Sequence, residues 1–458
     1  MTDFVEYLLY LLQRGMVLAV AAALVCGGVM MLLYWRHRKR YGEEKRFPWG
    51  RTLGFMALTG YLAVLLAVTV LRSAGGGGVN LHLGLAWREA WNQFTLKLWL
   101  NIILNIAVFV PLGVLLPLLW KGFRKWHRML LAGFALTLAI ELGQMVTGNL
   151  TDVDDLFHNT LGAMLGWCAV MFLLHLRQKK PGRAAACLLL PGAVAAVFGG
   201  VFLAYEMQEF GNLKYAPLYR ADASKISWTV ECGLTDEYSA PVFYVKPHDR
   251  ESADAFGFDL FERIGKECPD IYYYDNQTVM GNHHGGPFLN LNWLDRTWDL
   301  HGLKAPELPL QVDEQAMRKE LEQMGIDVPE GLIFTYPEEN VACLEADMLR
   351  VGDILYDGFI RRSIGFRGDY RLDYAMVTAQ LVREVEILTP AQAAQLLMDG
   401  WFYHSGWIEQ DGIREVTVTD WAMTYMTDSK GFYQPIYVFT LVSPQEDYPY
   451  EAIVPAIE

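Results

Sequence analysis

The residues best suited to chemistry in the N-terminal half are carboxylates and side-chain amides set among long apolar runs. They are Asn101, Asn105, Glu141, Gln144, Asp152, Asp154, Asp155 and Asn159. Carboxylates accept hydrogen bonds and bind cations, whereas amides both donate and accept. An ionisable group inside an apolar span is costly, so its presence suggests a function. These eight residues therefore form our candidate ligand-binding site.

Helical spacing places several of these residues on shared faces. The sets are Asn101 with Asn105, Glu141 with Gln144, and Asp155 with Asn159, Gly162 and Gly166. Each set also has a structural explanation. The amides could form hydrogen bonds between helices, and the glycines could form a close-packing face. The aspartates could form a solvated turn in which Asp154 or Asp155 caps a helix, Glu141 could be protonated and structural, and His158 is predicted to be interfacial.

Six stretches are long and apolar enough to cross a bilayer, whose core takes about 20 residues of helix. They are Met16–Trp35, Thr52–Leu71, Trp99–Trp120, Met129–Thr147, Leu156–Leu176 and Ala184–Tyr205. Only the fourth contains a formal charge, Glu141. The sequence therefore predicts an all-α membrane bundle of six transmembrane helices.

Basic residues predict the orientation of this bundle. They are concentrated in the loops after the first, third and fifth spans, at residues 36–51, 121–128 and 177–183. Loops rich in Lys and Arg face the cytoplasm. Both termini and residues 206–458 are then extracytoplasmic, and the candidate site lies in the outer leaflet of the cell membrane.

Charge is divided unevenly along the 458 residues. Residues 1–205 contain 19 Lys and Arg against 9 Asp and Glu, whereas residues 206–458 contain 19 against 43. The acidic part would be repelled by phosphates, which argues against nucleic acid as a partner. We predict three parts: an N-terminal transmembrane helix with its basic loop (1–48), a transmembrane domain (49–205) and an acidic extracytoplasmic domain (206–458).

The acidic part has the patterns of a soluble α+β domain. Helical periodicity is present at 254–265 and 313–325, and Thr389-Pro390 begins a third helix with an N-cap and an N1 proline. Strand-like runs occupy 241–245, 383–388, 413–426 and 435–442. The last two flank TDSKG, a plausible hairpin connection.

Cysteine and histidine usage gives little evidence of a cofactor. Six cysteines are too few for a disulfide scaffold. Cys232 and Cys268 could form a bridge, or the C-terminal cysteines could all be unpaired thiols. Asn282-His283-His284 could hold a metal, but a Gly-rich polar turn is the simpler interpretation. We expect no cofactor.

Two strings in the bundle resemble the signature of VanZ-like membrane proteins. They are NIILNIAVFVPLG and ELGQMVTGNLTDVDDLFHNTLGAMLG, and the resemblance covers roughly residues 50–180. It implies a link to teicoplanin-type glycopeptide resistance and the cell envelope, with no settled biochemical activity. By this resemblance, the family's motif positions correspond to all eight candidate residues, together with Pro111, Gly113 and Gly162. The family usually has Arg three residues before the first loop Asp, where this chain has Asn149. The C-terminal hairpin with QPIYVFTLV weakly resembles PepSY/YycI-like domains.

Three functions are consistent with these features. The favoured one is a non-enzymatic protein that binds an amphiphilic envelope component, such as a lipid-linked cell-wall molecule, at the outer leaflet. A second is a cation-dependent enzyme acting on a lipid-linked phosphate, with Asp152, Asp154 and Asp155 as metal ligands and Glu141 as general base. A third is a membrane-tethered regulator whose outer domain binds a partner protein.

Overall fold

The computed structural model describes residues 2–41, 47–69, 78–149, 151–235, 238–267, 270–274, 276–281, 286–304, 311–365, 368–409 and 412–457. Cys268 and Asn282-His283-His284 lie outside the described residues, so the possible bridge and the histidine cluster remain predictions. The chain divides into two compact units. A helical unit comprises Asp3–Ala90 and Thr95–Gln208, and a sheet-rich unit consists mainly of Glu209–Glu458.

The helical unit is built from helices whose apolar residues run all round, as expected for membrane spans. Its helices are α1 (Thr2–Tyr41), α2 (Trp49–Thr69), α3 (Leu85–Gln93), α4 (Leu96–Leu119), η1 (Lys121–Arg124), α5 (Trp126–Thr147), α6 (Val153–Arg177), α7 (Pro181–Ala186) and α8 (Leu189–Met207). Six helical segments of the described chain are long and apolar enough to cross a membrane. They are Gly15–Arg40, Trp49–Thr69, Leu96–Leu119, Trp126–Thr147, Val153–Arg177 and Pro181–Met207. The predicted spans are thus confirmed as apolar helices of sufficient length.

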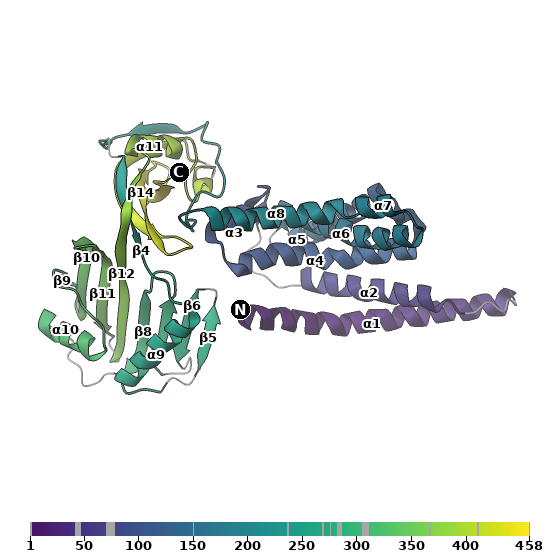
Figure 1. Ribbon diagram of the computed structural model, residues 1–458, viewed down its shortest axis with the longest axis horizontal. Helices are drawn as coiled ribbons and strands as arrows, with labels where there is room; N and C mark the ends of the chain where they lie inside the picture. The colour runs from purple at the N-terminus through teal and green to yellow at the C-terminus, as the bar shows by residue number, and fades with distance from the viewer. Residues whose placement is uncertain are drawn as a thin grey trace. The chain divides into compact units, whose positions relative to one another are not determined.

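Helix α6 lies at the centre of the packing and contacts both α4 and α5 (Figure 1). A Cβ atom on Gly162 would overlap the Ile106 carbonyl oxygen, and one on Gly166 would overlap that of Val110. Gly113 on α4 is equally confined by the α6 backbone. The predicted glycine face is therefore a close-packing face between α4 and α6, which holds the polar residues of both helices at short range.

The sheet-rich unit has a largely antiparallel sheet. Its strands are β3 (Ser227–Val230), β4 (Ser239–Tyr244), β5 (Ile271–Tyr274), β6 (Gln277–Gly281), β7 (Phe288–Asn292), β8 (Trp298–Lys304), β9 (Ile333–Glu338), β10 (Val341–Val351), β11 (Ile354–Ile364), β12 (Asp369–Glu386), β13 (Glu415–Thr427), β14 (Phe432–Val442) and β15 (Tyr450–Pro455). The long strand β12 pairs with β8 and β11 over its first part and with β4 over its last (Figure 1). It therefore contributes residues to three hydrophobic clusters of this unit.

Three helices contribute to these clusters: α9 (Arg250–Arg263), α10 (Glu314–Gln323) and α11 (Pro390–Met398). All three predicted helices are confirmed, and Thr389 caps α11 as expected. Helix α9 begins four residues earlier than predicted, because Asp249 and Ser252 form a capping box. The predicted strand at 383–388 is the end of the much longer β12, and the predicted hairpin joins β13 to β14.

Candidate functional site

Glu141 lies near the C-terminal end of α5, and its side chain is 3% exposed. Its Oε2 atom accepts a hydrogen bond from the backbone N–H of Asp152 at 3.1 Å. With the Gln144 amide turned so that its nitrogen faces Glu141, that nitrogen donates to both carboxylate oxygens at 3.2 and 3.1 Å. The Glu141 carboxylate is thus held by amide donors from its own helix and from the loop that follows.

Asp152 connects this loop to a distant part of the chain. The strands β1 (Val79–Asn80) and β2 (Thr151–Asp152) pair in parallel. Asp152 Oδ1 accepts from Asn80 Nδ2 at 3.1 Å and from the backbone N–H of Asp154 at 2.9 Å. Asp152 is therefore the N-cap of α6, and the prediction that Asp154 or Asp155 caps this helix is wrong. The cap lies two residues before Asp154, because the chain leaves β2 in extended conformation at Asp152.

Asp154 has a structural role. Its side chain is 2% exposed, and its two oxygens accept from the backbone N–H groups of Gly84 and Ala86 at 2.6 and 2.9 Å. These N–H groups belong to the beginning of α3, where a negative charge also favours the helix dipole. Asp154 therefore fixes the start of α3 against α6.

Asp155 points toward α4. Asn105 Nδ2 donates to Asp155 Oδ1 at 2.6 Å, across the glycine-lined contact between α4 and α6. One turn further along α6, Asn159 Nδ2 donates to Thr137 Oγ1 of α5 at 2.9 Å. Polar side chains thus connect α4, α5 and α6 within one bundle. Thr137 was not foreseen, because a single threonine in an apolar span carries no pattern.

Two predicted positions differ from this arrangement. Asn101 is exposed, and no hydrogen bond in the described part of the chain joins it to the other candidates. His158 is 1% exposed and accepts from Trp87 Nε1 at 2.7 Å, so its side chain packs inside the helical unit, and its depth in a membrane stays a prediction. It is buried because α3, which supplies Trp87, covers this part of α6. A local sequence pattern could not indicate that cover.

Asn149 occupies the position where the resemblance leads us to expect Arg. Helix α5 ends at Gly148, whose φ of 72° is left-handed, and the Asn149 backbone N–H donates to the Gln144 carbonyl at 2.9 Å. Its side-chain nitrogen donates to Thr147 Oγ1 at 2.8 Å. Asn149 therefore takes part in the end of α5 and brings no positive charge to this loop.

The cluster is rich in carboxylates and poor in cations. Glu141, Asp152 and Asp155 lie near enough to one another to interact electrostatically. No Lys or Arg among the described residues forms an ion pair with any of them. The described residues also contain no group of three or more metal-ligating side chains that could hold an ion. The cluster is best suited to accept hydrogen bonds from a ligand that brings its own donors.

A comparison with known families identifies the part of the chain that contains this cluster. Residues 55–175 match the family described as VanZ/LLP1. The chain contains a VanZ-family domain. That domain extends from α2 to α6 and includes all eight candidate residues. A VanZ-family domain with several apolar helices fits a multi-pass membrane protein.

Other comparisons add little to the VanZ assignment. No curated protein matches the chain. One solved structure, an uncharacterized protein from Eubacterium rectale ATCC 33656, is 10% identical and covers 51% of this chain and 88% of its own. Its TM-score of 0.25 is too low to establish a common fold.

Proposed function

We propose that the VanZ domain binds an amphiphilic component of the cell envelope at the outer leaflet, through Glu141, Gln144, Asp155 and Asn105. One observation carries the proposal: the described hydrogen bonds to the Glu141 and Asp155 side chains come from amides, with no basic partner. Carboxylates placed inside a bundle without a cation are costly to the fold. A bound ligand that supplies hydrogen-bond donors would offset that cost.

The chemistry of the cluster favours a particular class of headgroup. Carboxylate oxygens attract ammonium, amide N–H and hydroxyl groups and repel phosphate oxygens. Exposed apolar side chains on the same helix as Glu141, among them Leu138, Leu142 and Met145, offer a surface for an acyl chain. The ligand class is therefore a lipid whose headgroup carries sugar hydroxyls, amides or amines, as lipid-linked wall components do.

The enzymatic alternative is less well supported. A cation site would need Asp152, Asp154 and Asp155 to converge on one point. Asp152 caps α6, Asp154 accepts from the start of α3, and Asp155 accepts from α4. Their side chains serve three different partners, so a shared metal ion would require each to abandon its hydrogen bonds.

The same proposal includes the location of the site in the outer leaflet of the membrane and a role of the protein in resistance. The basic loops at 36–51, 121–128 and 177–183 support an orientation in which the cluster and residues 206–458 face outward. The VanZ assignment supports a connection with teicoplanin-type resistance or envelope homeostasis. In this orientation, the sheet-rich domain faces the wall from which the ligand would come.

Native mass spectrometry of the full-length protein, extracted in mild detergent from its host membrane, tests the proposal. We expect the wild type to retain a lipid adduct that Glu141→Gln loses. Glu206→Gln is the matched control, because Glu206 is exposed at the end of α8 and its substitution removes the same charge. The same adducts on both variants, or no adduct on the wild type, would refute ligand binding at this cluster.

A further inference from the structure

A hollow in the helical unit lies toward the opposite end of α4 from Asn105. Its volume is ≈ 760 Å³, and it is formed by the beginning of α2, the end of α4 and the short helix η1. Asn105 and Leu118 are separated by about 20 Å along the helix axis, from the 1.5 Å rise per residue. The hollow is therefore separate from the carboxylate cluster.

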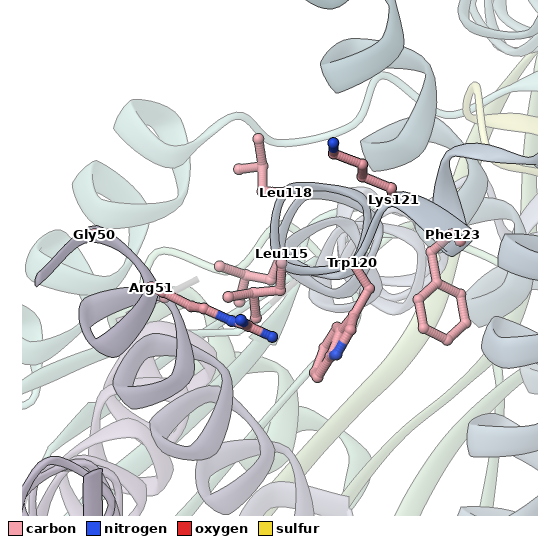
Figure 2. Close-up of a pocket in the computed structure, with 10 residues that line it drawn as sticks. Gly50, Arg51, Leu115, Leu118, Trp120, Lys121 and Phe123 are labelled. Carbon is pink, nitrogen blue, oxygen red and sulfur yellow. The ribbon is translucent and has the colours of Figure 1, made fainter. Parts of the chain in front are cut away.

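Arg51 supplies the positive charge of this hollow. Figure 2 shows its side chain reaching from α2 toward Leu115 and Trp120. Lys121, the first residue of η1 after the end of α4, lies on the other side of that helix end. Arg51 is exposed, and none of the carboxylates in the described ranges forms an ion pair with it. The hollow thus contains a guanidinium whose fork of donors is available to an anion.

Aromatic rings form the wall beside Arg51. The Arg51 guanidinium lies 5.7 Å from the centre of the Phe55 ring, and Phe55 packs edge-on against Trp120 at 5.2 Å. Trp and Tyr side chains gather at membrane interfaces because they combine an apolar ring with a polar group. These contacts give the hollow a polar edge beside an apolar wall.

The remaining lining is apolar. Leu115, Leu118 and Leu119 come from the last turns of α4, and Gly54 on α2 faces Leu119. A basic group beside a leucine surface matches an anionic headgroup with an attached acyl chain. This composition is the reverse of the carboxylate cluster, which offers acceptors and no cation.

We propose that this hollow binds an anionic phospholipid, with Arg51 holding the headgroup phosphate. The phosphate oxygens match the planar guanidinium and accept from two of its N–H groups. The acyl chain lies along Leu115 and Leu119. The hollow is next to the basic residues 121–128, which the positive-inside rule assigns to the cytoplasmic face, where anionic lipids attract basic groups.

Lipid titration of the delipidated full-length protein, followed by native mass spectrometry, tests this site. The probes are phosphatidylglycerol, phosphatidylcholine and free glycerol phosphate. We expect phosphatidylglycerol to bind in preference to the other two, and Arg51→Gln to weaken its binding about fivefold, as for one basic residue near a membrane surface. Arg51→Lys keeps the charge without the fork and should fall between wild type and Arg51→Gln.

Arg183→Gln is the matched control, because Arg183 belongs to another basic loop and does not line the hollow. Equal loss from Arg183→Gln and Arg51→Gln would show general electrostatic attraction and overturn the site. Binding of glycerol phosphate as tight as that of the lipid would overturn the assignment of a lipid occupant. The thermal stability of each variant in detergent excludes misfolding. Glu141→Gln should retain phosphatidylglycerol, which separates this result from the outer site.

Discussion

Two buried charged side chains, one in each unit of this protein, are stabilised in different ways. In the sheet-rich unit, Arg362 is 1% exposed and pairs with Glu320 at 3.0 Å, and Tyr370 donates to the same carboxylate at 2.6 Å. In the helical unit, Glu141 is equally buried but has only amide partners. The Arg362 charge is balanced by its opposite, whereas the Glu141 charge is left to uncharged donors.

This difference helps to distinguish a charged residue that is buried for stability from one that is buried for function. A buried ion pair satisfies both of its members without any outside molecule, so the fold alone accounts for it. A buried carboxylate without a cation must take a proton, accept strong donors or bind a ligand. The comparison therefore predicts that substitutions at Arg362 damage stability, whereas substitutions at Glu141 damage binding.

Removal of the buried cation should have the largest effect. Arg362→Met leaves the half-buried Glu320 beside Tyr370 without its counter-charge, which should destabilise the sheet-rich unit by up to about 3–5 kcal/mol. Chemical denaturation followed by near-UV circular dichroism measures the loss. Adding Glu320→Gln to Arg362→Met removes the unpaired charge and keeps an acceptor for Tyr370, so it should recover most of the stability. If the double variant were no more stable than Arg362→Met, charge balance would not explain the pair.

Asp428 is the carboxylate of the sheet-rich unit that most resembles Glu141. It is 1% exposed and accepts from the backbone N–H groups of Gly211, Lys430 and Phe432 at 2.6, 2.7 and 2.9 Å, and also from Gln434. Burial raises the pKa of Asp428, and its hydrogen bonds act in the opposite direction. With donors on both oxygens, Asp428 fixes the turn between β13 and β14 and the segment after α8.

Asp428→Asn should therefore destabilise the sheet-rich unit by about 1–3 kcal/mol, because an amide NH₂ would face buried donors. Urea unfolding of the full chain measures this change. Asp420→Asn is the control, since Asp420 is exposed on β13. A stability loss below that of the control would mean that the donors can turn to other acceptors.

Sequence patterns predict elements that depend on local residues, and they miss pairings between distant ones. Hydropathy located the apolar helices, and Thr389 with Pro390 indicated the start of α11. The two-residue pairing of β1 with β2 joins segments about 70 residues apart, so nothing local revealed Asn80 as a partner of Asp152. The packing of Trp87 over His158 was missed for the same reason.

The sequence predicted which residue types make up the candidate site, but not most of the contacts between them. Helical spacing correctly grouped Glu141 with Gln144, because residues three apart share a face. Spacing also grouped Asn101 with Asn105, but Asn105 donates to Asp155 of α6 whereas Asn101 is exposed. The partners of each aspartate depended on which helix faced it, and the sequence alone does not specify that arrangement.

Glu141→Gln should have a small effect on stability and a large effect on function. Interhelical hydrogen bonds in membranes average about 0.6 kcal/mol, and Gln keeps both size and hydrogen-bonding capacity. Thermal unfolding in detergent should change little, while teicoplanin susceptibility of a host expressing the variant at matched levels should match that of a host without the protein. Asp155→Asn should behave in the same way. Wild-type susceptibility with both variants would leave the carboxylates a packing role.

A half-buried group can also avoid an unpaired charge by staying neutral, and His248 is an example with the smallest expected effect. Burial and the neighbouring Arg296, whose Nε donates to His248 Nε2 at 3.0 Å, lower the pKa of His248 to about 4. In the unfolded chain, His248 has an ordinary pKa of about 6.5 and binds a proton at a pH where the folded protein keeps it neutral. The free energy of unfolding therefore falls as pH decreases from about 6.5 to about 4.

His248→Gln keeps an acceptor for Arg296 but cannot titrate. The melting temperature of the sheet-rich unit, followed by near-UV circular dichroism, should therefore decrease less between pH 7 and pH 4.5 in this variant than in the wild type. Identical decreases of the melting temperature in the two proteins would show that groups other than His248 cause the acid sensitivity.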